Sequence, residues 1–102
     1  MNTIDHGCMF SWHLEHEHPE RWKIIKEKIG FGYELVSYVN PQGRKIILST
    51  TGILMVKIEE FNMVITAYPA NMTKAKACFE AVGQKMPKDY GKIIIHNRQF
   101  GV

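Results

Sequence analysis

A helical period runs through the hydrophobic positions near the start of the chain. Trp22, Ile25 and Ile29 follow one another at spacings of three and four, which places their side chains on one face of a helix. Pro19 is tolerated at the first position of a helix and not in its interior, so the helix is predicted to begin there. Gly30 stands where a left-handed C-terminal cap is expected, and the helix is predicted to end at it.

The residues before Pro19 carry no such period. Residues 1–10 are predicted to form a loose lead-in, because a terminus without a pattern is commonly not held to the domain. Residues 11–18 contain helix formers, but Pro19 pushes His18 away from helical dihedrals. A separate turn or short helix is therefore predicted over residues 11–18.

From Tyr33 onward the period changes to two, and turn-forming residues arrive at close intervals. Connections this short cannot hold a parallel crossover, so neighbouring strands are predicted to pair antiparallel in a meander. The four predicted strands span residues 34–39, 45–50, 53–60 and 63–68.

Helical spacing returns after the meander. Asn71 or Thr73 is suited to cap a second helix, which Pro87 would stop. Residues 92–96 are predicted to form a last strand, and residues 97–102 a short tail. The apolar positions that keep the helical spacing are Ala75, Cys78, Phe79, Val82 and Met86.

These elements predict an α+β fold with an N-terminal helix, an antiparallel meander of about four strands, a second helix and a final strand. Both helices are expected on one face of the sheet, which leaves the opposite face partly open. Alternation along the fourth strand sends Met63, Ile65 and Ala67 toward the helices. Thr66 and Tyr68 then project onto the open face, where a site could form. The reverse parity is the alternative.

Composition places the chain among folded single domains. It has 102 residues, a mass of 11.8 kDa and 45% hydrophobic residues, so residues 1–102 are expected to share one core. The longest apolar run, residues 53–56, is far shorter than the roughly 20 residues that span a bilayer, so no membrane partner is expected. The N-terminus lacks the pattern of a secretory signal. Cys8 and Cys78 form no CxxC motif, which favours a reduced, cytoplasmic protein with inert thiols.

The formal charge of +3 permits an anionic partner such as RNA without demanding one. Arg44 lies in the first turn of the meander and is one candidate to bind such a partner. Lys92, His96 and Arg98 follow in the predicted last strand, where their spacings of four and two would place them on a common face. A solvated basic edge that deters aggregation is the alternative.

Three of the five histidines fall within six residues, at His13, His16 and His18. Imidazoles at this density suggest zinc, and His13 and His16 would share a helical face. However, His18 points elsewhere on any helix that holds all three, and both a second ligand cluster and the HExxH motif are absent from the sequence. No metal and no cofactor are therefore expected, and solvated histidines on a polar face are the alternative to a catalytic role.

His18 is better suited to proton transfer. An imidazole at the start of a helix lies near backbone donors that favour its neutral, proton-accepting form. Arg21, one turn later, offers a planar fork of donors to a phosphate. An ion pair of Arg21 with Glu17, four residues before it, is the alternative.

The segment EHPERWKII at 17–25, followed by a meander that ends in MVITAYP at 63–69, resembles a known group of nucleases. These are the phage-associated nuclease domains of the barnase, EndoU, colicin and RelE-like (BECR) ribonuclease superfamily, and the resemblance covers about residues 11–70. It implies a metal-independent enzyme that cuts RNA through attack by the ribose 2′-hydroxyl, with His18 as acid or base.

Such a site needs a base for the 2′-hydroxyl, a donor for the extra charge on the phosphate and an acid for the leaving 5′-oxygen. The resemblance implies that two hydroxyls of the fourth strand hold or polarise the phosphate. The residues assigned to these roles are His18 for proton transfer, with His16 or His13 as substitutes, Thr66 and Tyr68 for the phosphate oxygens, and Arg21 or Arg44 for positive charge.

Two functions from different classes follow. The first is a small metal-independent endoribonuclease of the toxin or phage-nuclease kind, restrained by a protein inhibitor in its host. The second is a non-catalytic module, such as a phage-encoded inhibitor or adaptor, whose sheet face and basic edge bind nucleic acid or a partner protein. A zinc-dependent hydrolase is a third hypothesis, and it predicts bound metal after purification.

Overall fold

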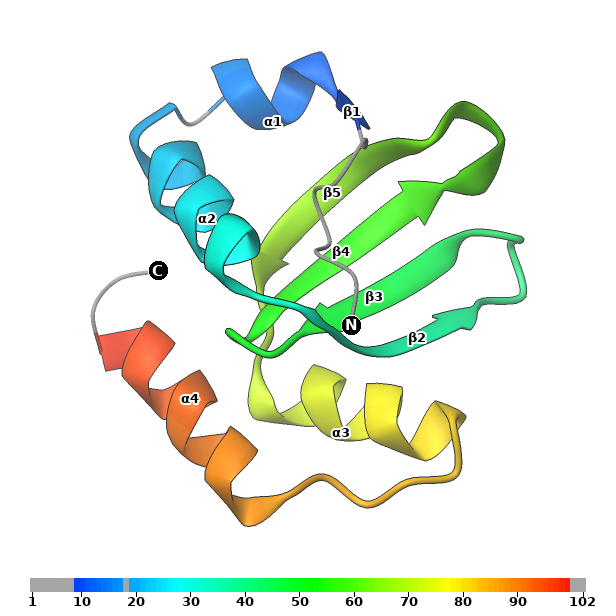
Figure 1. Ribbon diagram of the computed structural model, residues 1–102, viewed down its shortest axis with the longest axis vertical. Coiled ribbons are helices and arrows are strands. Elements are labelled where there is room, and N and C mark those ends of the chain that lie inside the picture. Colours follow the sequence, from blue (N-terminus) through cyan, green and yellow to red (C-terminus); the bar gives the residue numbers. More distant parts are fainter. Residues whose placement is uncertain (1–8, 18, 100–102) are drawn as a thin grey trace.

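Five strands form one sheet in the order β1-β5-β4-β3-β2 (Figure 1). The computed structural model describes residues 9–17 and 19–99. β1 pairs with β5 in parallel, and the other neighbouring pairs are antiparallel. The strands are β1 (Met9–Phe10), β2 (Glu34–Val39), β3 (Lys45–Ser49), β4 (Ile53–Ile58) and β5 (Met63–Pro69). The helices are α1 (Trp12–His16), α2 (Pro19–Phe31), α3 (Met72–Ala81) and α4 (Lys88–Gln99), with a 3₁₀ turn at Glu59–Phe61.

The α+β class and the meander of four antiparallel strands are confirmed, and so is a short helix ahead of a main helix that begins at Pro19. Gly30 is not the cap of that helix, because α2 continues to Phe31 before the chain leaves it at Gly32. The fourth-strand prediction starts correctly at Met63, whereas the third strand stops early, at Ile58, because the next residues form the 3₁₀ turn.

The prediction of a loose lead-in is wrong at its end. Met9 and Phe10 form β1, which extends the sheet beside Met63 and Val64 of β5. The ring of Phe10 also meets the ring of Trp22 edge to face, with centroids 5.1 Å apart. This strand brings the chain onto the edge of β5 immediately before α1.

The helices cover both faces of the sheet, which corrects the prediction of one covered and one open face (Figure 1). α2 packs its buried residues against one face, and α3 and α4 pack theirs against the other. Strands buried on both faces carry consecutive apolar residues rather than an alternation, as in Ile46-Ile47-Leu48 and Ile53-Leu54-Met55. The α2-side core is Trp22, Ile25, Ile29, Ile47, Ile53, Met55, Val64 and Ala67. The core on the other face, called the α3-side core below, is Val36, Ile46, Leu48, Leu54, Ala70, Ala75, Cys78, Phe79, Tyr90 and Ile94.

The predicted last strand is a helix, and the predicted tail begins inside it. α4 buries Tyr90, Ile94 and Asn97, whose spacings of four and three follow one helical face. The run Ile93-Ile94-Ile95 suits a strand locally, but packing against α3 and the sheet decides in favour of the helix.

Of the two residues that the sequence offers as the cap of α3, the structure uses Asn71. The Asn71 side chain accepts a hydrogen bond from the backbone N–H of Lys74 at 2.8 Å. The helix ends at Ala81, not at Pro87, because Gly83 adopts a left-handed φ of 71° shortly after it.

A short turn between β3 and β4 ties the helices of both faces to the sheet. On the α2 side, the Thr51 hydroxyl donates to the carbonyl of Lys28 at 2.8 Å. On the α4 side, the Tyr90 hydroxyl donates to the carbonyl of Ser49 at 2.6 Å, and the Asn97 amide donates to the carbonyl of Thr51 at 2.9 Å. The turn therefore supplies acceptors for the Tyr90 hydroxyl and the Asn97 amide nitrogen, while Asn97 Oδ1 is buried without a hydrogen-bond partner in the described part of the chain.

Ser49 shapes this turn from inside the core. Its hydroxyl accepts hydrogen bonds from the backbone N–H groups of Ile53, at 2.9 Å, and of Thr51, at 3.2 Å. The same oxygen lies 2.9 Å from the Thr51 hydroxyl, to which it can donate. A fully buried serine is therefore an internal cap for the turn.

Substituting Gly52 by alanine should destabilise the fold more than the same change at Gly43. Both glycines have left-handed φ angles, 86° and 79°, so each substitution incurs roughly 1–2 kcal/mol of backbone strain. Only the Cβ at Gly52 would collide, 2.6 Å from the Asn97 amide nitrogen, whereas nothing lies within 4 Å at Gly43. Urea unfolding of both variants gives the comparison, and equal losses would contradict this account of the turn.

Tyr90→Phe should lower the free energy of unfolding by about 1 kcal/mol, because it removes one buried hydrogen bond. The Ser49 carbonyl keeps a second bond, from the Gly52 N–H at 3.2 Å, so the loss stays modest. Burial raises the pKa of the Tyr90 hydroxyl, which keeps it protonated as a donor. Thermal unfolding measures the effect, with the exposed Tyr33→Phe as the matched control.

Candidate functional site

A pocket of about 390 Å³ lies between α1, α2 and the outer side of β5. α1 lies beside β5 because Ser11, the residue before the helix, hydrogen-bonds to that strand. The Ser11 backbone N–H donates to the carbonyl of Val64 at 2.9 Å, and the Ser11 hydroxyl lies 3.4 Å from the carbonyl of Ile65. The pocket is lined by His13, Leu14, Glu17, Arg21, Trp22, Ile25, Ile65, Thr66, Ala67 and Tyr68.

The floor of the pocket is apolar and rigidly supported. Trp22 and Ile25 are buried on the inner face of α2, and Leu14 packs from α1 onto the same core. An apolar floor of this kind favours a flat or apolar part of a ligand, and charged groups of a ligand would be bound at the rim.

The rim brings together an imidazole, a carboxylate and a guanidinium. His13 Nδ1 lies 3.7 Å from Glu17 Oε2, one turn further along the chain. Arg21 joins them from the first turns of α2. Among the described residues Glu17 pairs with His13 and not with Arg21, which was the alternative considered from the sequence. The spacing of four between His13 and Glu17 is the signal in the sequence for this pair.

Thr66 and Tyr68 border the pocket along β5, but their side chains lie on the other face of the sheet. Tyr68 packs against the α3-side core, and Lys74 Nζ lies 5.6 Å from its ring centroid. Thr66 pairs directly with Val56, which packs on that same core, and direct cross-strand partners share a face. The face to which these hydroxyls point is covered by α3 and α4, so the predicted open face does not exist.

A bulge in β5 explains why simple alternation does not describe this strand. Val56 pairs with Thr66, but the next residue, Lys57, pairs with Val64, so Ile65 is an extra residue in the ladder. Val64 and Ala67, three positions apart, consequently both face α2. The predicted parity holds for Ala67 and fails on the other side of the bulge.

Of the other two histidines in this segment, His16 does not line the pocket and His18 lies outside the described residues. His16 Nδ1 lies 2.9 Å from the carbonyl of Trp12, and its ring stacks on the Trp12 ring with centroids 4.3 Å apart. This holds His16 away from the pocket lining. His18, the first candidate for proton transfer, lies outside the described residues.

Apart from Arg21, the candidate phosphate-binding cations do not surround this pocket. Arg44 lies in the turn between β2 and β3, across the sheet from β5. Lys92, His96 and Arg98 lie on α4, so the predicted common strand face is wrong. Lys92 and His96 share one side of α4 and line a separate hollow, whereas Arg98 borders another beside Pro69. Lys92 also pairs with Asp89 at 3.6 Å.

The part of the chain that the structure describes contains no group of three or more His, Cys, Asp or Glu side chains arranged to hold a metal ion. Cys78 is buried, and burial raises the pKa of its thiol. Its sulfur lies 4.0 Å from the hydroxyl of Tyr38. Within the described ranges, no helix has the length and apolar character that crossing a membrane requires.

Comparison of the chain with models of protein families, with curated proteins and with solved structures gives no match.

Proposed function

We propose that this protein is a small, metal-independent endoribonuclease that acts in the pocket between α1, α2 and β5. One observation carries the proposal: His13, Glu17 and Arg21 stand together on the rim of a single pocket with an apolar floor. RNA cleavage by the 2′-hydroxyl needs proton transfer and charge stabilisation at one phosphate, and these three groups supply both.

His13 is the proposed base. Its Nδ1 lies 3.7 Å from the Glu17 carboxylate, longer than a hydrogen bond, and its Nε2 is the atom proposed to accept the proton of the 2′-hydroxyl. The negative carboxylate attracts the imidazolium that forms, and solvent screens this attraction because both side chains are largely exposed. Glu17 is in this scheme a positioning residue.

Arg21 is the proposed donor to the phosphate. Its guanidinium carries two parallel N–H groups that match the non-bridging oxygens, and it keeps its charge at every working pH. As the 2′-oxygen bonds to phosphorus, the added charge on these oxygens strengthens both hydrogen bonds. The P–O bond to the 5′-oxygen then breaks, water or an acid protonates that oxygen, and a 2′,3′-cyclic phosphate remains.

The biological setting proposed for this activity follows from the resemblance to toxin and phage nucleases. A chain that cuts RNA in the cytoplasm needs an inhibitor until it is released, so a protein inhibitor or antitoxin is the proposed partner beside RNA. The net charge of +3 favours approach to an RNA backbone.

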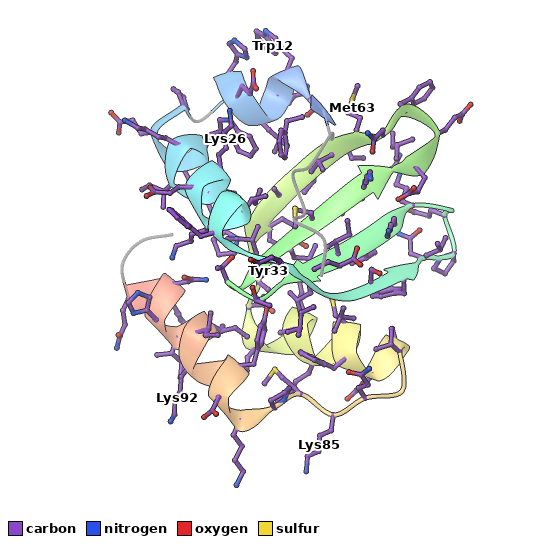
Figure 2. The ribbon with its side chains drawn as sticks, viewed as in Figure 1. Trp12, Lys26, Tyr33, Met63, Lys85 and Lys92 are labelled. Carbon is purple, nitrogen blue, oxygen red and sulfur yellow. The ribbon has the colours of Figure 1, made fainter. Side chains whose placement is uncertain are left out.

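A second candidate, RNA binding without cleavage, is favoured by Trp12 and by the orientation of the β5 hydroxyls. The Trp12 side chain projects from α1 and is 68% exposed (Figure 2). Exposed indole rings stack on bases in proteins that bind single-stranded nucleic acids. Thr66 and Tyr68, which the nuclease hypothesis places on the phosphate, point to the other face.

Purified protein should cut single-stranded RNA in the presence of a chelator. His13→Ala and Arg21→Ala should each lower the cleavage rate on the order of 10²-fold, because each removes a positioned proton-transfer or charge-stabilising group. His16→Ala is the matched control from the same helix, since His16 lies outside the pocket lining and should keep the rate.

Uncut RNA with folded wild-type protein would refute the enzyme, and retained RNA binding would then support the second candidate. Cleavage that needs a divalent metal, or that survives both pocket substitutions, would also refute the proposed site. Circular dichroism spectra establish that each variant is folded.

Tyr68→Phe separates the observed geometry from the expectation based on resemblance. Because the Tyr68 ring packs on the α3-side core, removing its hydroxyl should leave the cleavage rate nearly unchanged. A large loss of rate with unchanged stability would show that this hydroxyl reaches the substrate. His18→Ala, assayed in parallel, tests the histidine that lies outside the described residues.

A further inference from the structure

β2 is an edge strand whose defences against pairing are confined to its first two positions. It lies at the end of the sheet, and among the described residues no strand adjoins its outer side. Natural edge strands are commonly protected by lysines, prolines or inward-pointing charges. The sequence ELVSYV carries no lysine or proline. Its one charge, Glu34, pairs with Lys45 of the neighbouring strand at 3.5 Å, and a bulge, another common protection, lies at Leu35.

The exposed side chains along this edge are apolar. Leu35 is 41% exposed and Val39 is 65% exposed, and Phe31 and Tyr33 continue the exposed apolar surface before the strand. An apolar edge with unpaired backbone groups is a template for another strand.

The backbone groups that would bind such a strand can be assigned. The Asn40 N–H donates to the Arg44 carbonyl at 2.9 Å, so the backbone N–H of the residue just after β2 points toward the β3 side. Alternation along an antiparallel ladder then directs the N–H and C=O groups of Ser37 and Val39 to the outer side. A bulge at Leu35 disturbs only the beginning of the strand.

We infer that β2 pairs with β2 of a second copy of this chain, antiparallel across a two-fold axis at Ser37. The strand is self-complementary in this register. Leu35 of each copy lies opposite Val39 of the other, so two apolar pairs become buried, and Glu34 lies opposite the neutral Asn40. No like charges meet directly. The two Ser37 residues exchange both of their outward hydrogen bonds, and the sheets of the two copies become continuous.

The other exposed sheet edge is a poorer template. The part of β5 that extends beyond β1 is flanked by α1 and α2, which line the pocket beside it, and ends in Pro69. Proline cannot donate to a ladder. β2 is flanked on its α2 side by solvent-exposed apolar side chains instead.

Sedimentation velocity over a wide range of protein concentrations tests the pairing. The wild-type chain should move toward twice the monomer mass of 11.8 kDa as concentration rises. Ser37→Pro should weaken this self-association by roughly 10- to 100-fold, because it removes both donors at the two-fold axis. The N–H of Ser37 takes no part in the β2–β3 ladder, so proline is compatible with the monomer fold. Ser37→Thr, which keeps the donor, is the matched control and should associate like the wild type.

Val39→Lys gives an independent test should proline at position 37 prevent folding. Val39 is largely exposed, so a charge there is tolerated in the monomer, but at the interface it would be buried against Leu35 of the other copy. A wild-type chain that stays monomeric at all concentrations would overturn the inference and leave the edge for a strand of another protein. A dimer that survives both substitutions would overturn it as well, because its interface would lie elsewhere.

Discussion

The turn between β3 and β4 is the constraint on which the rest of the architecture depends. Two layers of helices on opposite faces of a sheet are separated by the sheet and do not contact each other across it. In this protein the turn projects past the end of the strands, where Lys28 of α2 and Tyr90 and Asn97 of α4 each make a hydrogen bond to it. Because Ser49 is fully buried beneath them, any shift of the turn would leave several polar groups without partners at once.

The sequence predicts the local elements well and the layering poorly. Alternation, turn residues and Pro19 are local signals, and they locate four strands and the start of α2. By contrast, the prediction of one open face is wrong. Consecutive apolar residues, such as residues 53–56 of β4, are typical of a sheet that is buried on both faces. The wrong prediction of a strand at 92–96 has the same cause, because the second covered face was not predicted. Residues 93–95 suit either structure, and only the second covered face creates a surface that needs a helix.

The candidate site shows what a one-residue irregularity does to prediction. Arg21 lies on the rim of a pocket that β5 also lines, and the sequence predicted that Arg21 and the fourth strand contribute to one site. The bulge at Ile65 was not predicted, because a bulge is defined by the pairing with β4 and leaves no mark in the pattern of a single strand. Beyond the bulge Thr66, Ala67 and Tyr68 keep the predicted alternation, whereas Val64 before it faces α2 against the prediction. The hydroxyls of Thr66 and Tyr68 lie outside the pocket because α3 and α4 cover the face to which they point, so the polar groups at its rim come from α1 and α2.

The pocket and the apolar edge lie toward opposite edges of the sheet, so pairing at one edge does not cover the pocket at the other. β4 and β3 stand between β5, which borders the pocket, and β2, which carries the edge. In the two-fold pairing the inner strands of both copies lie between the two pockets, so both pockets face outward. For the nuclease proposed above, RNA would then reach each pocket without passing the interface. Association adds a second cationic body to the first, which doubles the charge that attracts an RNA strand without adding a contact to the reacting phosphate. A dimer of this kind would change how tightly RNA is captured, while the rate of the chemical step is determined within each pocket.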